Sequence, residues 1–317
     1  MIQGLPGSIA SRLAHWRARP LGSWEHTWRV FRRRLGTLLR WIILLDFAYI
    51  FLFPVIFMIT TSIKTVHELN NPAVNWISRT PTNEGYLLAM EVLQYFDGVR
   101  VSLGTSIVAA VGQTLIGAMV AYGFARIRFP GRDFLFALLL FTIVVPPQTT
   151  MVPQFMLYTD LKWTNTYLPL MVPPFLSYGV RGGILLIVFR QFFRGLPYEL
   201  EDAAHVDGAG PFRIFWQIML PLAKPAILVV MLFSLVWTWN DNFTPWLVLR
   251  DNTLYTLTQR MEIFNSLLNN FSGSTYTRLE ENTFMAAVTL TVLPVLLIYL
   301  FAQRYFTQSI DRTGLVE

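Results

Sequence analysis

Long apolar runs alternate with short polar segments along this chain, and the apolar runs have the length of membrane-spanning helices. A helix needs about 20 predominantly apolar residues to cross the hydrocarbon layer of a bilayer. Six runs meet this requirement, so the pattern predicts an all-α integral membrane protein with six transmembrane helices. The predicted spans are Trp41–Thr61, Val101–Phe124, Phe134–Phe155, Leu168–Phe189, Pro225–Leu247 and Thr283–Gln303.

Several of the predicted spans contain prolines, which would break a helix in a soluble protein. In a membrane bundle, neighbouring groups can satisfy the carbonyls that a proline leaves free. We therefore expect kinked helices at these positions. The prolines are Pro54, Pro146, Pro147, Pro173, Pro174 and Pro294.

The distribution of basic residues predicts the orientation of the chain, because cytoplasmic loops carry an excess of lysine and arginine. Seventeen of the 25 basic residues lie on the side of the two termini if the chain crosses six times, and seven lie on the other side. Both termini are therefore expected in the cytoplasm. The net charge of +6 is interpreted as this topology signal and not as a nucleic-acid surface.

The chain is expected to divide into a basic cytoplasmic N-terminal tail, residues 1–40, and a six-helix transmembrane domain, residues 41–317. The tail mixes arginines with Trp16, Trp24 and Trp28, a composition that suits a helix on a membrane surface near anionic lipid. A solvated or disordered tail fits the same composition. The sequence leaves both alternatives open.

Composition also limits the chemistry of the chain. Hydrophobic residues make up 54% of it, and charged residues make up only 14% against about a quarter in soluble domains. It has no cysteine, and its four histidines are scattered, so a metal centre is not expected. No lysine follows a glycine as a phosphate-binding loop requires, and no nucleophile or zinc motif is present. The chain is therefore expected to be no enzyme and to bind no cofactor of its own.

The most informative cytoplasmic segment is 195–225, between the fourth and fifth predicted spans. It is interpreted as two short helices. Pro197 precedes several acidic residues, which favour a helix N-terminus. Gly208 can adopt the left-handed conformation that ends a helix, and Pro211 can begin the next one. An ordinary surface helical hairpin that connects two spans would have the same features.

This segment resembles the EAA loop of binding-protein-dependent ATP-binding-cassette (ABC) importer permeases. The resemblance rests on the run Glu-Asp-Ala-Ala-x-x-Asp-Gly-Ala from Glu201, followed by Ile-x-Leu-Pro-Leu-x-x-Pro up to Pro225. It extends from about residue 41 to the C-terminus through motifs such as Val145-Pro-Pro-Gln148 and Trp239-Asn-Asp241. The most similar type is the second, six-span permease of maltose-type sugar systems.

The resemblance implies a coupling helix that docks in a groove of a cytoplasmic ATPase dimer, which binds ATP and magnesium. It also implies a second, homologous permease subunit and an extracytoplasmic solute-binding protein, which the segments 62–100 and 248–282 would contact. The motif's first glutamate corresponds to Asp202 and follows Glu201, so which carboxylate meets the ATPase is open. The implied coupling residues are Glu201, Asp202, Ala203, Ala204, Asp207 and Gly208.

Polar side chains inside the predicted spans are candidates for the translocation path, because such groups are costly in lipid and usually face a cavity or a partner. The candidates are Arg181, Trp239, Asn240 and Asp241. Aromatic rings beside amides and acids suit a sugar, whereas interhelical packing is the alternative reading. Arg181 would either contact an acidic sugar or bond to neighbouring helix ends.

Together these features predict a permease subunit in the bacterial cytoplasmic (inner) membrane that imports a carbohydrate, such as an oligosaccharide or glycoside, by alternating access. A separate ATPase would supply the energy. Two alternatives stay open: the same architecture for a non-sugar solute, and an integral membrane enzyme.

Overall fold

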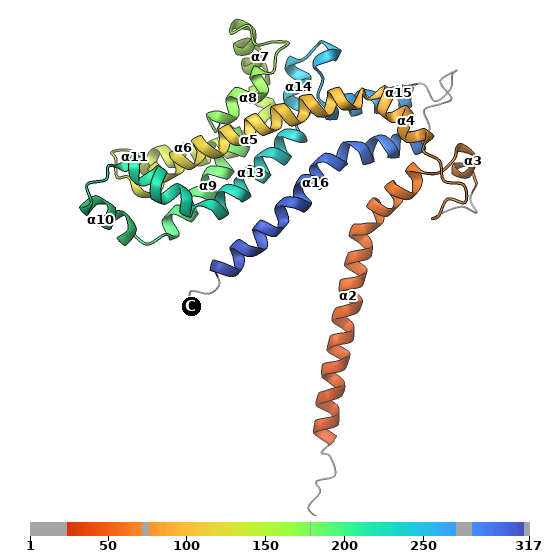
Figure 1. Ribbon diagram of the computed structural model, residues 1–317, viewed down its shortest axis with the longest axis horizontal. Coiled ribbons are helices and arrows are strands. Elements are labelled where there is room, and N and C mark those ends of the chain that lie inside the picture. Colours follow the sequence, from red (N-terminus) through yellow and green to blue (C-terminus); the bar gives the residue numbers. More distant parts are fainter. Residues whose placement is uncertain (1–23, 72–75, 178, 271–280, 314–317) are drawn as a thin grey trace, which may run out of the picture. The chain divides into compact units, whose positions relative to one another are not determined.

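The computed structural model describes residues 24–71, 76–177, 179–270 and 281–313. Within these ranges the chain forms helices and no β-strand, as predicted (Figure 1). The elements are α2 (Trp24–Ser62), α3 (Val66–Leu69), α4 (Glu84–Val92), α5 (Tyr95–Arg126), α6 (Arg132–Val144), η1 (Pro147–Thr150), α7 (Met151–Asp160), α8 (Leu168–Phe175), α9 (Gly179–Gly195), α10 (Glu199–Val206), α11 (Pro211–Ile214), η2 (Phe215–Met219, a π-helical turn), α12 (Leu220–Leu222), α13 (Lys224–Trp239), α14 (Phe243–Val248), η3 (Asn252–Leu254), α15 (Leu257–Asn270) and α16 (Glu281–Thr313).

The chain forms two compact units, residues 1–57 and 58–317. The first unit consists, in its described part, of residues 24–57 of helix α2. In this helix the first predicted span continues without a break from residues 24–40. Those residues are therefore helical, while residues 1–23 of the predicted tail lie outside the described chain. The boundary of the tail at residue 40 stays a prediction.

The second unit is organised around α5, which packs against α8, α9 and α13. Figure 1 shows α5 running beside α9 and α13. Small side chains on α5 allow the close approach of these helices, as in many membrane bundles. The small buried residues of α5 include Ala109, Ala110, Gly112, Gly117, Ala118, Ala121 and Ala125.

The closest of these approaches is that of α8 to α5 at Gly112. A Cβ atom at this position would lie 2.2 Å from Cε2 of Phe175, so no larger residue fits without moving the ring. The absence of a side chain at Gly112 therefore sets how near the end of α8 lies to α5.

The third predicted span is bent, and a second bend lies just before the start of the fifth predicted span. Helix α6 and the segment Pro147–Asp160 meet at 97°, and the segment Pro211–Leu222 meets α13 at 79°. Proline removes a backbone donor and clashes with the preceding turn, so the Pro146-Pro147 and Pro221 to Pro225 regions supply the physical cause of both bends. The kink expected at Pro146 and Pro147 is confirmed, whereas the bend at Pro221 to Pro225 was not predicted. Helices α2 and α16 continue through Pro54 and Pro294.

Three described helices are long and apolar enough to cross a membrane. If each of the two bent pairs is counted as one span, the number of such segments rises to as many as five. The fourth predicted span is divided instead: α8 ends at Phe175 after Pro173 and Pro174, and α9 begins at Gly179. Two adjacent prolines end α8 because neither supplies a backbone donor. The helices therefore do not confirm the count of six.

A cluster of buried side chains joins α4, α15 and α16. A buried arginine on α15 connects this cluster to the start of α5. Arg260 is 8% exposed and donates from Nε to the Tyr255 carbonyl and from Nη2 to the Asn252 carbonyl. Its Nη1 donates to Oε1 of Gln94. Neutral acceptors thus hold this cation in place.

The segment between α2 and α4 folds around the carboxylate of Glu68, which is 5% exposed. Its Oε2 accepts a 2.6 Å hydrogen bond from the Ser78 hydroxyl, and its Oε1 accepts from the amides of Arg79 and Thr80 at 2.8 and 3.0 Å. The Ser78 bond and these amides lower the pKa of Glu68 to about 2, against the desolvation that would raise it.

We predict that Glu68→Gln loosens this segment, because an amide cannot accept all of these bonds as a carboxylate does. Hydrogen exchange at the amides of Arg79 and Thr80 should quicken, and Glu91→Gln, at an exposed position on α4, should leave it unchanged. Because the folded-state pKa is lowered, the carboxylate's stabilising effect is complete above about pH 5 and is lost as the pH falls towards 2. Exchange equal to wild type would contradict this role.

Candidate functional site

The coupling segment predicted from sequence is a short helix, α10, with one face turned inward. Glu201 and Ala204 are buried, and Ala204 packs in a cluster with Phe193, Ile214 and Phe215. The opposite side of the helix is exposed and combines small, apolar and acidic side chains. We call this surface the α10 outer face; it consists of Asp202, Ala203, Val206, Asp207 and Gly208.

The turn after α10 has the conformation predicted for it. Gly208 has a φ of 77°, in the left-handed region, and its amide donates to the His205 carbonyl at 3.0 Å. The Ala209 amide donates back to the Ala204 carbonyl at 2.9 Å, which closes the helix C-terminus. Pro211 then begins α11, as expected.

One buried arginine holds the inner side of this segment. Arg126, the last residue of α5, donates from Nε to the Phe193 carbonyl at 2.9 Å and from Nη2 to the Leu196 carbonyl. Its guanidinium lies 4.0 Å from the centre of the Tyr198 ring, and Nε lies 3.4 Å from Oε1 of Glu201. The end of α5 is therefore joined to the end of α9 and to the start of α10.

The two adjacent carboxylates of α10 lie in different environments. Glu201 faces the buried Arg126, and its burial raises its pKa while the arginine opposes that shift. Asp202 is exposed on the α10 outer face. The geometry thus assigns Glu201 to a contact within the chain and leaves Asp202 available to a partner.

A polar cavity of about 430 Å³ lies among the helices that pack around α5. Helices α5, α7, α8, α9, α13 and α14, the turn η1 and Asp241 contribute to its wall. Its lining residues are Gln113, Pro147, Gln148, Gln154, Tyr158, Pro169, Leu170, Pro173, Pro174, Arg181, Ser234, Thr238, Asp241, Phe243 and Thr244.

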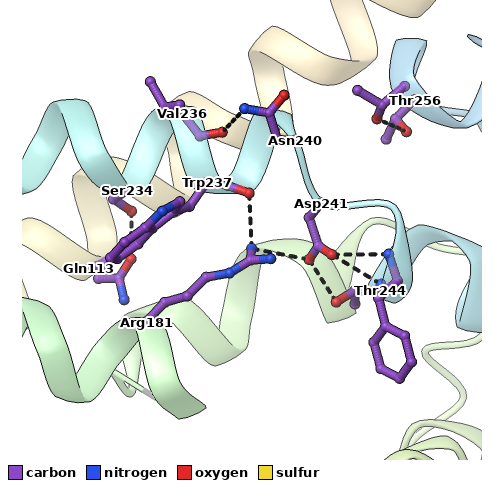
Figure 2. A network of polar contacts seen from close by, with 11 residues as sticks. Gln113, Arg181, Ser234, Val236, Trp237, Asn240, Asp241, Thr244 and Thr256 are labelled. Atoms are coloured by element: carbon purple, nitrogen blue, oxygen red, sulfur yellow. Dashed lines mark hydrogen bonds and ion pairs between the residues drawn. The ribbon is translucent and has the colours of Figure 1, made fainter. Parts of the chain in front are cut away.

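An ion pair crosses this cavity wall between α9 and the turn after α13. Figure 2 shows the Arg181 side chain reaching between the Trp237 carbonyl and Asp241. Nη1 of Arg181 donates to that carbonyl at 2.9 Å and lies 3.4 Å from Oδ2 of Asp241. Beside it, the buried Ser234 hydroxyl donates to Oε1 of Gln113 at 2.5 Å and joins α13 to α5.

The family of the chain follows from comparison with known proteins. Residues 113–312 match the family described as "Binding-protein-dependent transport system inner membrane component". The chain belongs to this family. It is accordingly a transport component and a multi-pass membrane protein, and the matched region contains both α10 and the polar cavity.

Relatives of known role extend over most of the chain. The arabinooligosaccharides transport system permease protein AraQ of Halalkalibacterium halodurans is 31% identical over 289 residues, 89% of this chain and 99% of that protein. The polygalacturonan/rhamnogalacturonan transport system permease protein YtcP of Bacillus subtilis is 29% identical over 88% of this chain and 97% of its own length.

The fold also occurs in a solved structure. A chain of a bacterial ABC transporter involved in the import of the acidic polysaccharide alginate superposes with a TM-score of 0.73, covering 86% of this chain and 97% of that one. The sequence identity is 20%, so the similarity shows a shared fold.

The residues predicted for coupling in this permease lie together on α10 and the turn after it, four of the six on the outer face and two inward. The sequence analysis did not identify Arg126 as a functional residue. It stands at the end of an apolar run and was counted only among the basic residues that indicate the cytoplasmic side. Tyr198, whose ring covers its guanidinium, was missed as well. The function of all these residues in coupling stays a prediction.

The residues predicted for the translocation path separate in the structure. Arg181 and Asp241 line the cavity as an ion pair. Trp239 is 3% exposed and packs in the cluster of α4, α15 and α16, and the Asn240 side chain donates to the Val236 carbonyl at 3.0 Å. Neither Trp239 nor Asn240 lines the cavity. Polar residues such as Gln113 do line it, but in the sequence each of them appears only as a polar position in an apolar run.

No three histidine, aspartate or glutamate residues within the described ranges lie close enough to hold a metal ion together.

We predict that Arg126→Met detaches the inner side of α10 from α5 and α9. The variant loses two bonds to carbonyls and leaves Glu201 without its counter-charge, a change that costs about 3 kcal/mol at buried pairs. Hydrogen exchange across α10 in the purified protein should quicken. Arg128→Met removes an exposed arginine two residues away and should leave the exchange of α10 as it is. Unchanged exchange in the Arg126 variant would refute the anchoring role.

Proposed function

We propose that this permease is one subunit of an ABC importer that moves a carbohydrate, an oligosaccharide or glycoside, across the bacterial inner membrane by alternating access. The single observation that carries the proposal is the construction of α10: its inner side is fixed to α5 and α9 through Arg126, and its outer face is open. A helix held in this way can pass a partner's movement to the helices around the cavity. The named roles of AraQ and YtcP support a carbohydrate as cargo.

The proposed topology has six spans, with both termini and α10 in the cytoplasm. The excess of arginine on the side of the termini supports it. In this arrangement α8 and α9 together form the fourth span, broken at Pro173 and Pro174. Broken helices are tolerated in membranes where the freed backbone groups line a cavity, and both prolines line the polar cavity here.

The proposed partners follow from the same arrangement. The α10 outer face would dock on an ATPase dimer, which binds ATP and magnesium, and a second, homologous permease would complete the pathway. An extracytoplasmic binding protein would deliver the solute. Purification of the complex from membranes should recover a phosphate-binding-loop ATPase and a second permease with this chain. An active chain that purifies alone would refute the proposal in favour of an integral membrane enzyme.

We predict that Gly208→Val disrupts docking of the ATPase. Valine is unfavourable at a φ of 77°, and no atom lies within 4 Å of the position where its Cβ would stand, so the effect is one of backbone conformation alone. ATPase co-purification and solute uptake should both fall. Gly210→Val is the matched control, since Gly210 has an ordinary φ of −77° and equal space. Wild-type assembly in the Gly208 variant would show that the turn is not part of the docking site.

We predict that Asp202, and not Glu201, is the carboxylate that the ATPase recognises. Asp202→Asn should weaken binding of the ATPase about tenfold, as expected for the loss of one charged hydrogen bond, without changing hydrogen exchange within α10. Glu199→Gln removes a charge from an exposed position on the same helix and serves as the control. If the Asp202 variant binds the ATPase with wild-type affinity, another contact carries recognition.

A further inference from the structure

The cavity wall has a definite charge composition. Of its 15 lining residues, only Arg181 and Asp241 carry a full charge at neutral pH, and they face each other. The part of the wall that this chain supplies is therefore electrically balanced.

This ion pair is held in place on both sides, so the balance is built into the fold. Asp241 accepts hydrogen bonds at Oδ1 from the amides of Phe243 and Thr244, at 3.1 and 3.3 Å, and at Oδ2 from the Thr244 hydroxyl at 2.8 Å. Arg181 is tied to the Trp237 carbonyl at 2.9 Å (Figure 2). The bonds to the start of α14 hold the carboxylate in place.

The rest of the wall suits a ligand rich in hydroxyl groups. Amides and hydroxyls can each donate and accept hydrogen bonds, as sugar hydroxyls do. They alternate with apolar surface that can cover the C–H faces of a sugar ring. The neutral polar residues are Gln113, Gln148, Gln154, Tyr158, Ser234, Thr238 and Thr244, and the apolar ones are Pro147, Pro169, Leu170, Pro173, Pro174 and Phe243.

We infer that this cavity admits uncharged oligosaccharides and that Asp241, by occupying Arg181, selects against acidic ones. The inference rests on the proposed function as a carbohydrate permease. The side chain of Arg181 is 44% exposed, and Asp241 and the Trp237 carbonyl both contact its Nη1. A uronate carboxylate that bound the rest of the guanidinium would lie near the fixed carboxylate of Asp241, and two like charges so close repel each other. A neutral sugar meets no such obstacle.

The relatives do not decide this point, because their named substrates include both arabinooligosaccharides and polygalacturonan. The neutral net charge of the Arg181–Asp241 pair favours an uncharged sugar over an acidic one. It also favours, for Arg181, the alternative of a bond to a neighbouring helix end over direct contact with an acidic sugar.

Equilibrium binding to the purified permease–ATPase complex, without the solute-binding protein, tests the selectivity of the cavity itself. The probes are a neutral arabinotriose and an acidic trigalacturonate of equal length. The wild-type complex should bind the neutral probe and not the acidic one. Asp241→Asn, which leaves the charge of Arg181 uncompensated, should improve binding of the acidic probe about tenfold.

Two further variants separate charge from structure. Asp241→Asn combined with Arg181→Gln removes both charges and should restore the preference for the neutral probe. Asp160→Asn removes an equal charge from an exposed position outside the cavity and should leave both affinities at their wild-type values.

The outcomes distinguish this inference from the proposed function. Wild-type complex that binds trigalacturonate as well as arabinotriose, or better, overturns the selectivity and leaves the carbohydrate permease standing. An Asp241→Asn complex that assembles normally but gains no affinity for trigalacturonate overturns the role of Asp241. An assembled wild-type complex that binds neither probe and takes up neither class of sugar with its binding protein overturns the assignment of a carbohydrate, and this inference with it.

Discussion

The α10 segment of this permease depends on one buried cation. The last carbonyls of a helix have no partner within the helix. Here the guanidinium of Arg126, at the end of α5, donates hydrogen bonds to the carbonyls of Phe193 and Leu196 at the end of α9. The same group lies against the Tyr198 ring and faces Glu201. The end of α5 therefore meets the end of α9 and the start of α10, which lie at least 67 positions later in the chain, at one side chain. Both α5 and α9 continue from this point to the polar cavity, which they line with Gln113 and Arg181.

The helices around α5 are held together by close packing, because lipid offers little hydrophobic driving force for helices to associate. The row of alanines and glycines on α5 brings α8, α9 and α13 near its backbone. Gly112 is the tightest point, where the ring of Phe175 takes the space of a side chain. Because Pro173 and Pro174 lie on the same helix as Phe175 and line the cavity, this contact also sets the position of one cavity wall.

Much of this arrangement follows from local features of the sequence, and the remainder depends on distant contacts. The apolar runs predicted the helical class, and Pro146 and Pro147 predicted one of the two bends. Gly208 was predicted to be left-handed because its neighbours have the pattern of a helix end. The division of Glu201 and Asp202 between inside and outside was not predictable, because it depends on Arg126, 75 positions earlier in the chain. Arg181 and Asp241 were predicted for the translocation path, but the rest of the cavity wall was missed for the same reason: Gln113 and Ser234 are separated by 121 positions, and only folding brings them to one wall.

The pairing of Arg181 with Asp241 has an electrical consequence for the transport cycle. A charge carried through the full membrane field exchanges about 2.3 kcal/mol with each 100 mV of potential. Two opposite charges fixed to each other at 3.4 Å form a dipole, and a dipole that shifts as one body moves almost no net charge through the field. A movement that carries Arg181 and Asp241 together therefore exchanges almost no energy with the membrane potential through this pair.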